Sequence, residues 1–400
     1  MSSSVTLQAE GSRFPATTQR SHQGCWPHSE DETLEEQYFC RVGGEKEVKT
    51  YSIALLVVAV LVCFNMAPVG VFAQSGTLTG AGSTFVNPLM SKWSKEYHTL
   101  HPNIQINYQS IGSGGGRQQF LAKTVAFGAS DAPLTDEQLA QAGGVANVVE
   151  IPVTQGSVVI TYNLPDVSKQ LRFSPETIAG MYLGTIKLWS DPKIAADNPG
   201  VSLPVKPVLV VHRSEGSGTT DIFTDYLSKV SAEWKTKVGR GSSVQWPAGI
   251  GGQGNEGVAN QVKNTPGGVG YIELAFARGN KMSYGSVKNR AGNYIDPDPK
   301  NVTNAAASLK DLPADLRFSI TDQLGPQAYP IAGTTWVLLY KTQPDAKQGK
   351  LVAAFVQWAI TDGQKYATEL DYAVLAKTLA QKAEAALRTV TCGGKPCLQK

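Results

Sequence analysis

The sequence predicts a two-lobed α/β protein in which each lobe is a mostly parallel sheet flanked by helices and two hinge strands join the lobes. The chain has 400 residues, which is more than one hydrophobic core usually holds. Strand, turn and helix patterns alternate three times within about sixty residues after position 75, which is typical of parallel α/β folds. Two long apolar segments, 151–164 and 329–341, have the character of strands that cross between two units.

These two crossing segments divide the chain into an outer and an inserted unit. We expect lobe 1 to comprise residues 74–156 and 328–400, and lobe 2 to comprise the inserted residues 157–327. Two connections of this kind are typical of a hinged protein with a cleft between its lobes.

The first 73 residues differ from the rest. Residues 1–50 contain the acidic stretch SEDETLEE without apolar periodicity, so we expect them to be disordered or to reflect a start site placed too early. Lys46 and Lys49 then precede an uncharged run over residues 51–73 that ends in VFA. A basic flank, an apolar stretch and a small-x-small exit predict a secretory signal cleaved after Ala73, and hence a periplasmic or extracytoplasmic protein.

Two alternatives for this apolar run stay open. Its length approaches the ~20 residues of a membrane span, so it is also compatible with a retained anchor, although Pro68 and Gly70 break its second half. A lipoprotein signal through Cys63 is less well supported, because no small residue directly precedes this cysteine.

Charge and cysteine content narrow the possible partners. The formal net charge of +3 indicates neither a nucleic-acid-binding groove nor a polybasic membrane-binding patch. Once the signal is removed, Cys392 and Cys397 are the remaining cysteines, spaced as CGGKPC around a Gly-Gly turn. In an exported chain this pair predicts a small terminal disulfide, whereas a metal clip would need further ligands that no nearby His or Cys supplies.

Polar residues collect at the predicted strand ends near the start of the mature chain. An amphipathic helix that Pro102 stops has apolar residues at three- and four-residue spacing, namely Leu89, Met90, Trp93, Tyr97 and Leu100. Residues 104–113 alternate as a strand, 114–125 restart a helix, and 126–134 contain a short strand. Ligands bind at the carboxyl ends of strands in such sheets. The polar residues at these ends are Ser83, Thr84, Ser113 and Asp131.

Three glycine-containing turns precede predicted helices: GAGSTF, SIGSGGG and EGSGTT. A helix N-terminus presents unpaired N–H groups and partial positive charge, so each turn is able to bind an anion, although each alone is more often a plain helix cap. The third follows the apolar run 205–211 and Arg213, and by itself it is also compatible with a nucleophilic serine or a simple corner. The three turns together favour an anion site.

The motifs LTGAGSTF, NYQSIGSGGG, FGASDAPL and RSEGSGTT stand in an order and spacing that resemble the phosphate-binding subunits of phosphate ABC transporters, which are type II periplasmic binding proteins. The motifs YLGTIKLW, VQWPAGIGGQGNEGV, GGVGYIELAFA, TTWVLLYK and LDYAVL extend the resemblance over residues 78–375. It implies a two-lobed protein that holds phosphate between its lobes without a metal or another cofactor and passes it to membrane permease subunits. Residues 1–50 have no counterpart in that pattern.

The resemblance also implies the roles of individual residues. The positions that match the family's phosphate ligands are Thr84, Phe85 and Ser113 with Asp131 on one lobe, and Arg213, Ser217, Gly218 and Thr219 on the other. Asp131 matches the carboxylate that accepts the ligand's proton. Phosphate near neutral pH carries a proton and sulfate does not, and a site built around one such hydrogen bond is able to reject the analogue that lacks it by ~10⁴ to 10⁵. The alternative role for Asp131 is a cap for a helix within 132–140.

One departure from the family's pattern falls in the third turn. Glu215 stands where the family commonly has Asp, two residues after the arginine that this carboxylate is expected to orient. The side chain is one methylene longer, so it is able to pair with Arg213, but the geometry of the pair and the affinity are open.

We therefore expect a monomeric phosphate receptor that performs no chemistry and binds no nucleic acid. The alternatives are a receptor for another tetrahedral oxyanion, such as sulfate or arsenate, and a secreted phosphatase that uses the same pocket. The sequence argues against a phosphatase, because it has no recognisable metal cluster and no base near Ser113 or Ser217. The stretch 249–257 contains G-x-G-x-x-G without a preceding apolar strand or a ribose-binding acid, so dinucleotide binding is disfavoured. His212 lacks the G-x-S-x-G context of a hydrolase.

Overall fold

The structure is a computed structural model that describes residues 75–398. The predicted features at residues 1–50 and 51–73, including the signal and Cys63, lie outside the described residues. Within residues 75–398, no helix has the length and apolar character needed to cross a bilayer.

A nine-stranded sheet runs through the whole described chain in the order β2-β1-β3-β12-β4-β8-β6-β7, with β9 paired to β4. One end is the parallel trio β1 (Gly76–Gly82), β2 (Ile104–Ser110) and β3 (Phe127–Ser130). The other end is the parallel trio β6 (Leu209–Arg213), β7 (Ile250–Gly252) and β8 (Gly268–Glu273). Between them lie the antiparallel strands β4 (Val148–Tyr162) and β12 (Ala332–Tyr340), and β9 is Ser283–Tyr284. The sheet thus consists of two parallel trios joined by two long antiparallel strands, which confirms the predicted fold class.

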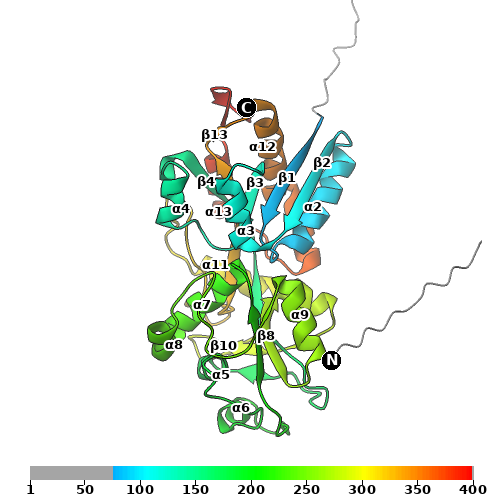
Figure 1. The fold of residues 1–400 in the computed structure, drawn as a ribbon, viewed down its shortest axis with the longest axis vertical. Coiled ribbons are helices and arrows are strands. Elements are labelled where there is room, and N and C mark those ends of the chain that lie inside the picture. The colour runs from blue at the N-terminus through cyan, green and yellow to red at the C-terminus, as the bar shows by residue number, and fades with distance from the viewer. Residues whose placement is uncertain (1–74, 399–400) are drawn as a thin grey trace, which may run out of the picture. The chain divides into compact units, whose positions relative to one another are not determined.

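The partner of β4 changes halfway along the strand. Residues up to Ser157 pair with β12, and residues from Val158 onward pair with β8. All fifteen residues of β4 are buried, as expected for a strand that is covered on both faces. Figure 1 shows the same division, with the two ends of the described chain in one half and its middle in the other.

Helices flank both halves of the sheet (Figure 1). Those beside the β1 trio are α2 (Asn87–Leu100), α3 (Gly112–Leu121), α4 (Asp136–Gln141), α12 (Ala346–Ile360) and α13 (Lys377–Leu387). The middle of the chain forms α5 (Pro175–Tyr182), α6 (Pro192–Asp197), α7 (Gly218–Val230), α8 (Ala232–Lys237), α9 (Gly254–Asn264), α10 (Leu274–Gly279) and α11 (Pro299–Ala307). Two small sheets complete the fold: β5 (Arg172–Phe173), β10 (Ser286–Lys288) and β11 (Tyr294–Ile295), and β13 (Thr342–Gln343), β14 (Thr391–Cys392) and β15 (Lys395–Pro396).

Helix α2 follows its sequence pattern with one exception. Four of the five apolar residues that define its amphipathic pattern are buried, and the indole of Trp93 also donates to the Gly363 carbonyl at 2.8 Å. The fifth, Leu100, is 57% exposed, so the apolar spacing extends beyond the buried face of the helix. The helix ends at this residue, and its last turn no longer packs against the core.

Three element boundaries differ from the sequence pattern. Helix α3 begins at Gly112 rather than 114, which moves Ser113 into its first turn. Strand β6 begins only at Leu209, because the preceding Val208 N donates to Lys187 O, outside the sheet, at 2.9 Å. Helix α7 begins at Gly218, directly after its cap Ser217, so it includes the last three residues of the predicted turn EGSGTT.

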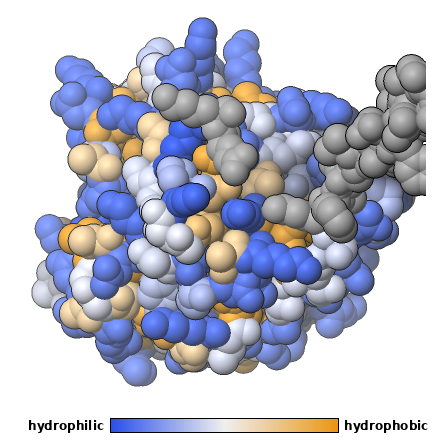
Figure 2. Space-filling model, turned by 90° about the horizontal axis from the view of Figure 1, so that it is seen from above, coloured by the Kyte–Doolittle hydropathy of each residue, from blue (hydrophilic) through white to orange (hydrophobic). Residues whose placement is uncertain are grey.

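A disulfide crosslinks the C-terminal end of the described chain. Cys392 and Cys397 form a disulfide with a Cα–Cα distance of 4.9 Å across the β14–β15 hairpin. Gly393 and Gly394 turn the hairpin with φ values of 61° and 78°, a region that favours glycine. Figure 2 shows one face of the molecule, on which hydrophilic side chains predominate and hydrophobic patches stay small.

Candidate anion-binding site

The parallel register brings the polar residues that follow β1, β2 and β3 to one edge of the sheet. Gly82 at the end of β1 pairs with Ser110 of β2 and with Ala129 of β3. Ser83 and Thr84 follow β1, Ser113 lies in the first turn of α3, and Asp131 follows β3. The carboxyl ends of neighbouring parallel strands meet, so these side chains lie together as the pattern predicts.

Asp131 is the centre of this cluster and is only 3% exposed. Its Oδ1 accepts from the hydroxyls of Ser83 at 2.6 Å and Thr335 at 2.7 Å, and its Oδ2 lies 3.3 Å from Ser113 Oγ. Burial raises the pKa of Asp131 to about 6, and the hydrogen bonds from Ser83 and Thr335 and the charge of Arg213 offset part of the rise. Near neutral pH the group is therefore an ionised acceptor.

Asp131 does not cap the helix that follows it. Thr135 is the cap of α4, with its hydroxyl accepting from Gln138 N and the Gln138 side chain accepting from Thr135 N. The capping alternative for Asp131 is thus excluded.

The second segment of the site begins where β6 ends. Arg213 is the last residue of β6, and Ser217 caps α7 by accepting from Thr220 N at 3.1 Å. The N–H groups of Gly218 and Thr219 lie in the first turn of this 13-residue helix, where helix geometry provides no acceptor for them. These donors and the helix dipole favour a bound negative charge.

Glu215 pairs with Arg213 through a single oxygen. Its Oε1 accepts from Arg213 Nε at 3.0 Å, from Arg213 Nη2, and from Gly254 N at 3.0 Å. Within residues 75–398 the buried Oε2 has no hydrogen-bond partner. Glu215 therefore holds the Nε–Nη2 edge of the guanidinium with one oxygen instead of through a two-oxygen fork, and Arg213 Nη1 donates to Thr219 Oγ1 at 3.2 Å.

The two segments approach each other closely at glycines. Gly114 N donates to Gly216 O at 2.8 Å. A Cβ atom built on Gly218 would lie 2.5 Å from Ser113 Oγ and 2.6 Å from Asp131 Oδ2, so a larger side chain does not fit there. The absence of a side chain brings the first turn of α7 against Asp131.

Phe85 contributes its backbone to this region, while its ring belongs to the core. The side chain is fully buried and packs edge-to-face on Tyr372 with 6.2 Å between ring centroids. The Tyr372 hydroxyl donates to Phe85 O at 2.6 Å, which fixes the turn after β1.

Sequence reasoning missed two residues of this site. Thr335 lies in β12 within the motif TTWVLLYK, and no residue pattern there assigns its hydroxyl to a carboxylate. Asn255 lies in the stretch 249–257 and donates to Thr84 Oγ1 at 2.8 Å and to Thr219 Oγ1 at 3.2 Å. Neither contact has a signal in residue spacing, because both depend on the way distant segments pack.

The two rival motifs have other roles in the structure. The glycine-rich stretch 249–257 forms the three-residue strand β7 and the start of α9, and its Gly254 N–H is taken by Glu215. The ring of His212 stacks on Trp246 with 4.8 Å between centroids, and its Nδ1 lies 2.9 Å from Arg213 O. In the described range 75–398, no three His, Cys, Asp or Glu side chains group as metal ligands would.

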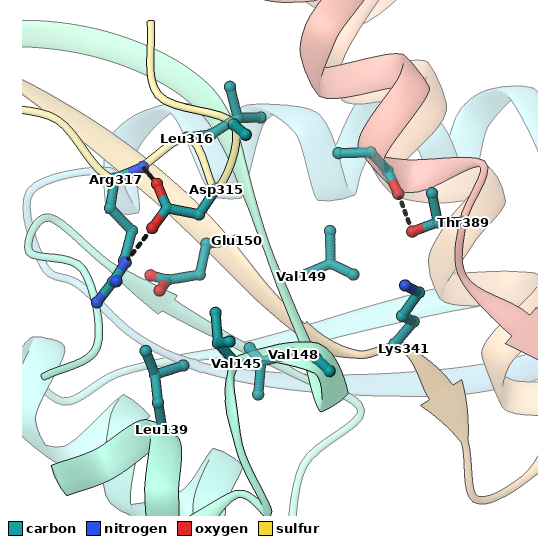
Figure 3. A pocket seen from close by; sticks show the side chains of 13 residues that line it. Leu139, Val145, Val148, Val149, Glu150, Asp315, Leu316, Arg317, Lys341 and Thr389 are labelled. Atoms are coloured by element: carbon teal, nitrogen blue, oxygen red, sulfur yellow. Dashed lines mark hydrogen bonds and ion pairs between the residues drawn. The ribbon is translucent and has the colours of Figure 1, made fainter. Parts of the chain in front are cut away.

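A separate cavity of about 240 Å³ lies at the start of β4 (Figure 3). Its lining includes Glu150, Arg317 and Lys341 but none of the predicted site residues. Burial raises the pKa of Glu150 to about 7, and a hydrogen bond from Leu134 N offsets part of the rise. This carboxyl is thus buried like Asp131 but lies in a cavity that contains none of the predicted site residues.

Comparisons with known proteins agree with this architecture. A family model described as "PBP superfamily domain" matches residues 69–363. The "Phosphate-binding protein PstS" of Xylella fastidiosa (strain 9a5c) is 45% identical over 314 residues, which cover 78% of this chain and 85% of that protein. The protein of the same name from Pasteurella multocida (strain Pm70) is 41% identical over 333 residues, or 83% and 95% of the two chains.

Among solved structures, the "Phosphate-Binding Protein from Stenotrophomonas maltophilia" matches with a TM-score of 0.62 and 21% identity. The match covers 80% of this chain and 99% of that one, and at this identity it concerns the fold alone. The family model matches well over half of this chain, and each of the two relatives aligns with more than two thirds of both chains. The chain therefore belongs to the PBP superfamily and, within it, to the family of the phosphate-binding protein PstS.

Proposed function

We propose that this chain binds inorganic phosphate outside the cytoplasm and delivers it to the permease subunits of a phosphate ABC transporter. The observation that carries the proposal is Asp131, a buried carboxylate that faces the donor-rich first turn of α7. The names of the relatives from Xylella fastidiosa and Pasteurella multocida support the same ligand.

The division of donors and acceptors in the site supports a partly protonated anion. The free N–H groups of the α7 first turn, the guanidinium of Arg213 and nearby hydroxyls donate to ligand oxygens, and Asp131 accepts. The proposed ligands are Thr84, Phe85, Ser113, Asp131, Arg213, Ser217, Gly218 and Thr219, with Glu215 orienting Arg213. Sulfate brings no proton to Asp131, so binding it would leave a buried carboxylate facing lone pairs.

The organisation of the chain follows from this role. Lobe 1 comprises residues 74–156 and 328–400, and lobe 2 residues 157–327, so that closure about β4 and β12 encloses the anion. A signal within 51–73 exports the protein, which acts as a monomer, binds no nucleic acid and performs no chemistry. No metal or other cofactor takes part.

Titration calorimetry on the purified chain with phosphate, sulfate and arsenate tests the proposal. We expect micromolar or tighter phosphate binding and at least ~10⁴-fold weaker sulfate binding. Arsenate also carries a proton near neutral pH, so Asp131 does not reject it. Asp131→Asn should lower the ratio of phosphate to sulfate affinity, whereas Glu150→Gln, which alters a buried carboxyl away from the site, should leave that ratio unchanged. Equal affinities of the unaltered protein for phosphate and sulfate would contradict the proposal.

Hydrolysis of a chromogenic phosphate ester by the purified chain tests the alternative that the protein is a phosphatase. The Ser217 hydroxyl accepts from Thr220 N, and this hydrogen bond does not activate it as a nucleophile. We expect no turnover with or without added divalent metal. Metal-dependent hydrolysis that disappears in Ser217→Ala would replace the transport function with an enzymatic one.

A further inference from the structure

Asn255 connects the segments that meet at the anion site. It is the second residue of α9 and is 0% exposed. Its side chain bonds to Thr84 after β1, to Thr219 in the first turn of α7, and to the backbone of Glu273 at the end of β8. A polar side chain so deeply buried and fully bonded fixes the geometry of its partners.

The orientation of the Asn255 amide follows from one obligate donor. Glu273 N lies 3.0 Å from Asn255 Oδ1. A backbone N–H is only able to donate, so the amide oxygen must face it, and the amide nitrogen must face the opposite way. The NH₂ group therefore points at the two threonine hydroxyls.

Each of these hydroxyls receives two hydrogen bonds from groups that cannot accept. Thr84 Oγ1 accepts from Asn255 Nδ2 at 2.8 Å and from Asn255 N at 3.3 Å. Thr219 Oγ1 accepts from Asn255 Nδ2 at 3.2 Å and from Arg213 Nη1 at 3.2 Å. A hydroxyl has two acceptor lone pairs and one proton, so both lone pairs are occupied and the proton must point elsewhere.

We propose that Asn255 is a positioning residue that turns the hydroxyls of Thr84 and Thr219 into fixed donors toward the bound anion. The inference rests on the proposed binding of phosphate between these two residues. Fixed donors favour ligand oxygens without protons and leave Asp131 as the acceptor for the single protonated oxygen. Asn255 thus contributes to the choice of a singly protonated oxyanion without contacting it.

The test is a double-mutant cycle measured by phosphate titration calorimetry on the purified full chain. Asn255→Ala should weaken phosphate binding by about tenfold to a hundredfold, the range typical of residues that orient a ligand-binding group. In a background with Thr84→Val and Thr219→Val, the same change should weaken binding by less than about twofold, because the hydroxyls through which it acts are gone. Losses that simply multiply would assign Asn255 a structural role only and overturn the inference.

A matched control and a second variant keep the test decisive. Asn289 is a buried asparagine whose amide donates to the carbonyls of Gly325 and Ala328 away from the site, so Asn289→Ala should lower the melting temperature without changing phosphate affinity. If Asn255→Ala does not fold, Asn255→Asp decides. It retains the acceptor for Glu273 N but offers a second acceptor to the hydroxyls, which turns their protons inward.

Asn255→Asp should lose at least about a hundredfold in phosphate affinity, and unaltered affinity would overturn the inference. Failure of the proposed function is distinguishable from failure of this inference. In the first case the unaltered protein does not bind phosphate. In the second it binds phosphate, and the cycle shows no coupling.

Discussion

Asp131 makes the stability of the phosphate-free protein depend on pH by an amount that follows from its burial. Its pKa is raised from the ordinary 3.8 to about 6 in the folded protein. Each pKa unit corresponds to about 1.4 kcal/mol, so ionising this group in the folded state costs about 3 kcal/mol more than in the unfolded chain. Replacing it by the non-titrating Asn isolates this contribution.

The sign follows from which state holds the proton. Between about pH 4 and about pH 6 the unfolded chain has lost the Asp131 proton while the folded chain keeps it. Raising the pH therefore favours unfolding. The stabilising contribution is fully present below about pH 4, is lost as the pH rises through about 6, and stays constant above about pH 7.

Urea unfolding in phosphate-free buffer, from about pH 4 to about pH 8, measures the effect. The free energy of unfolding of Asp131→Asn minus that of the unaltered protein should rise by about 3 kcal/mol between about pH 4 and about pH 7 and stay constant above that. Glu150 and Glu273, whose pKa values burial also raises, titrate in both proteins and cancel in the difference. A difference that does not vary with pH would refute the argument.

Three further predictions concern other parts of the structure. Glu215→Gln should weaken phosphate binding about tenfold in calorimetry, because a neutral oxygen orients Arg213 less firmly, and unchanged binding would show that the pair is dispensable. Arg117, which is 5% exposed with an unpartnered Nε within residues 75–398, should tolerate Met. The hydrogen bond from Arg117 Nη2 to Ser242 Oγ at 2.7 Å does not offset the desolvation of the cation, so a fall of more than about 3 °C in a phosphate-free thermal melt would contradict this. Replacing Cys392 and Cys397 by Ser should lower the free energy of unfolding by about 2 kcal/mol in a denaturant titration, and an unchanged value would contradict a stabilising crosslink.

The fold was predictable because the spacing of apolar residues and the order of strands and helices along the chain determine it. Alternating strands and helices predict parallel trios, and the long apolar segments 151–164 and 329–341 predict β4 and β12, which the structure contains with boundaries shifted by a few residues. The misplaced details depend on local chemistry. Strand β6 starts late because Val208 N donates to Lys187 O outside the sheet, and Leu100 is exposed because its helix ends there.

The candidate site was predictable only in part. Residues next to strand ends and helix starts, such as Ser113 and Asp131, come together because the topology brings those ends to one edge. Thr335 and Asn255 reach the same region from distant segments, and their positions depend on side-chain packing that no spacing rule encodes. The single-oxygen pairing of Glu215 with Arg213 is likewise a three-dimensional outcome, since the sequence shows only that the side chain is one methylene longer.

Counting donors and acceptors also explains why residue type alone does not rank the hydroxyls near this site. The hydroxyl of Thr335 donates to Asp131, which as a carboxylate only accepts, so its proton is unavailable to a ligand. The hydroxyls of Thr84 and Thr219 accept from the amide of Asn255, which in that position only donates, so their protons are available. One carboxylate and one amide thus give three chemically identical side chains opposite hydrogen-bonding directions. The direction of the proton, set by the buried partner, decides which threonine is able to serve an anion.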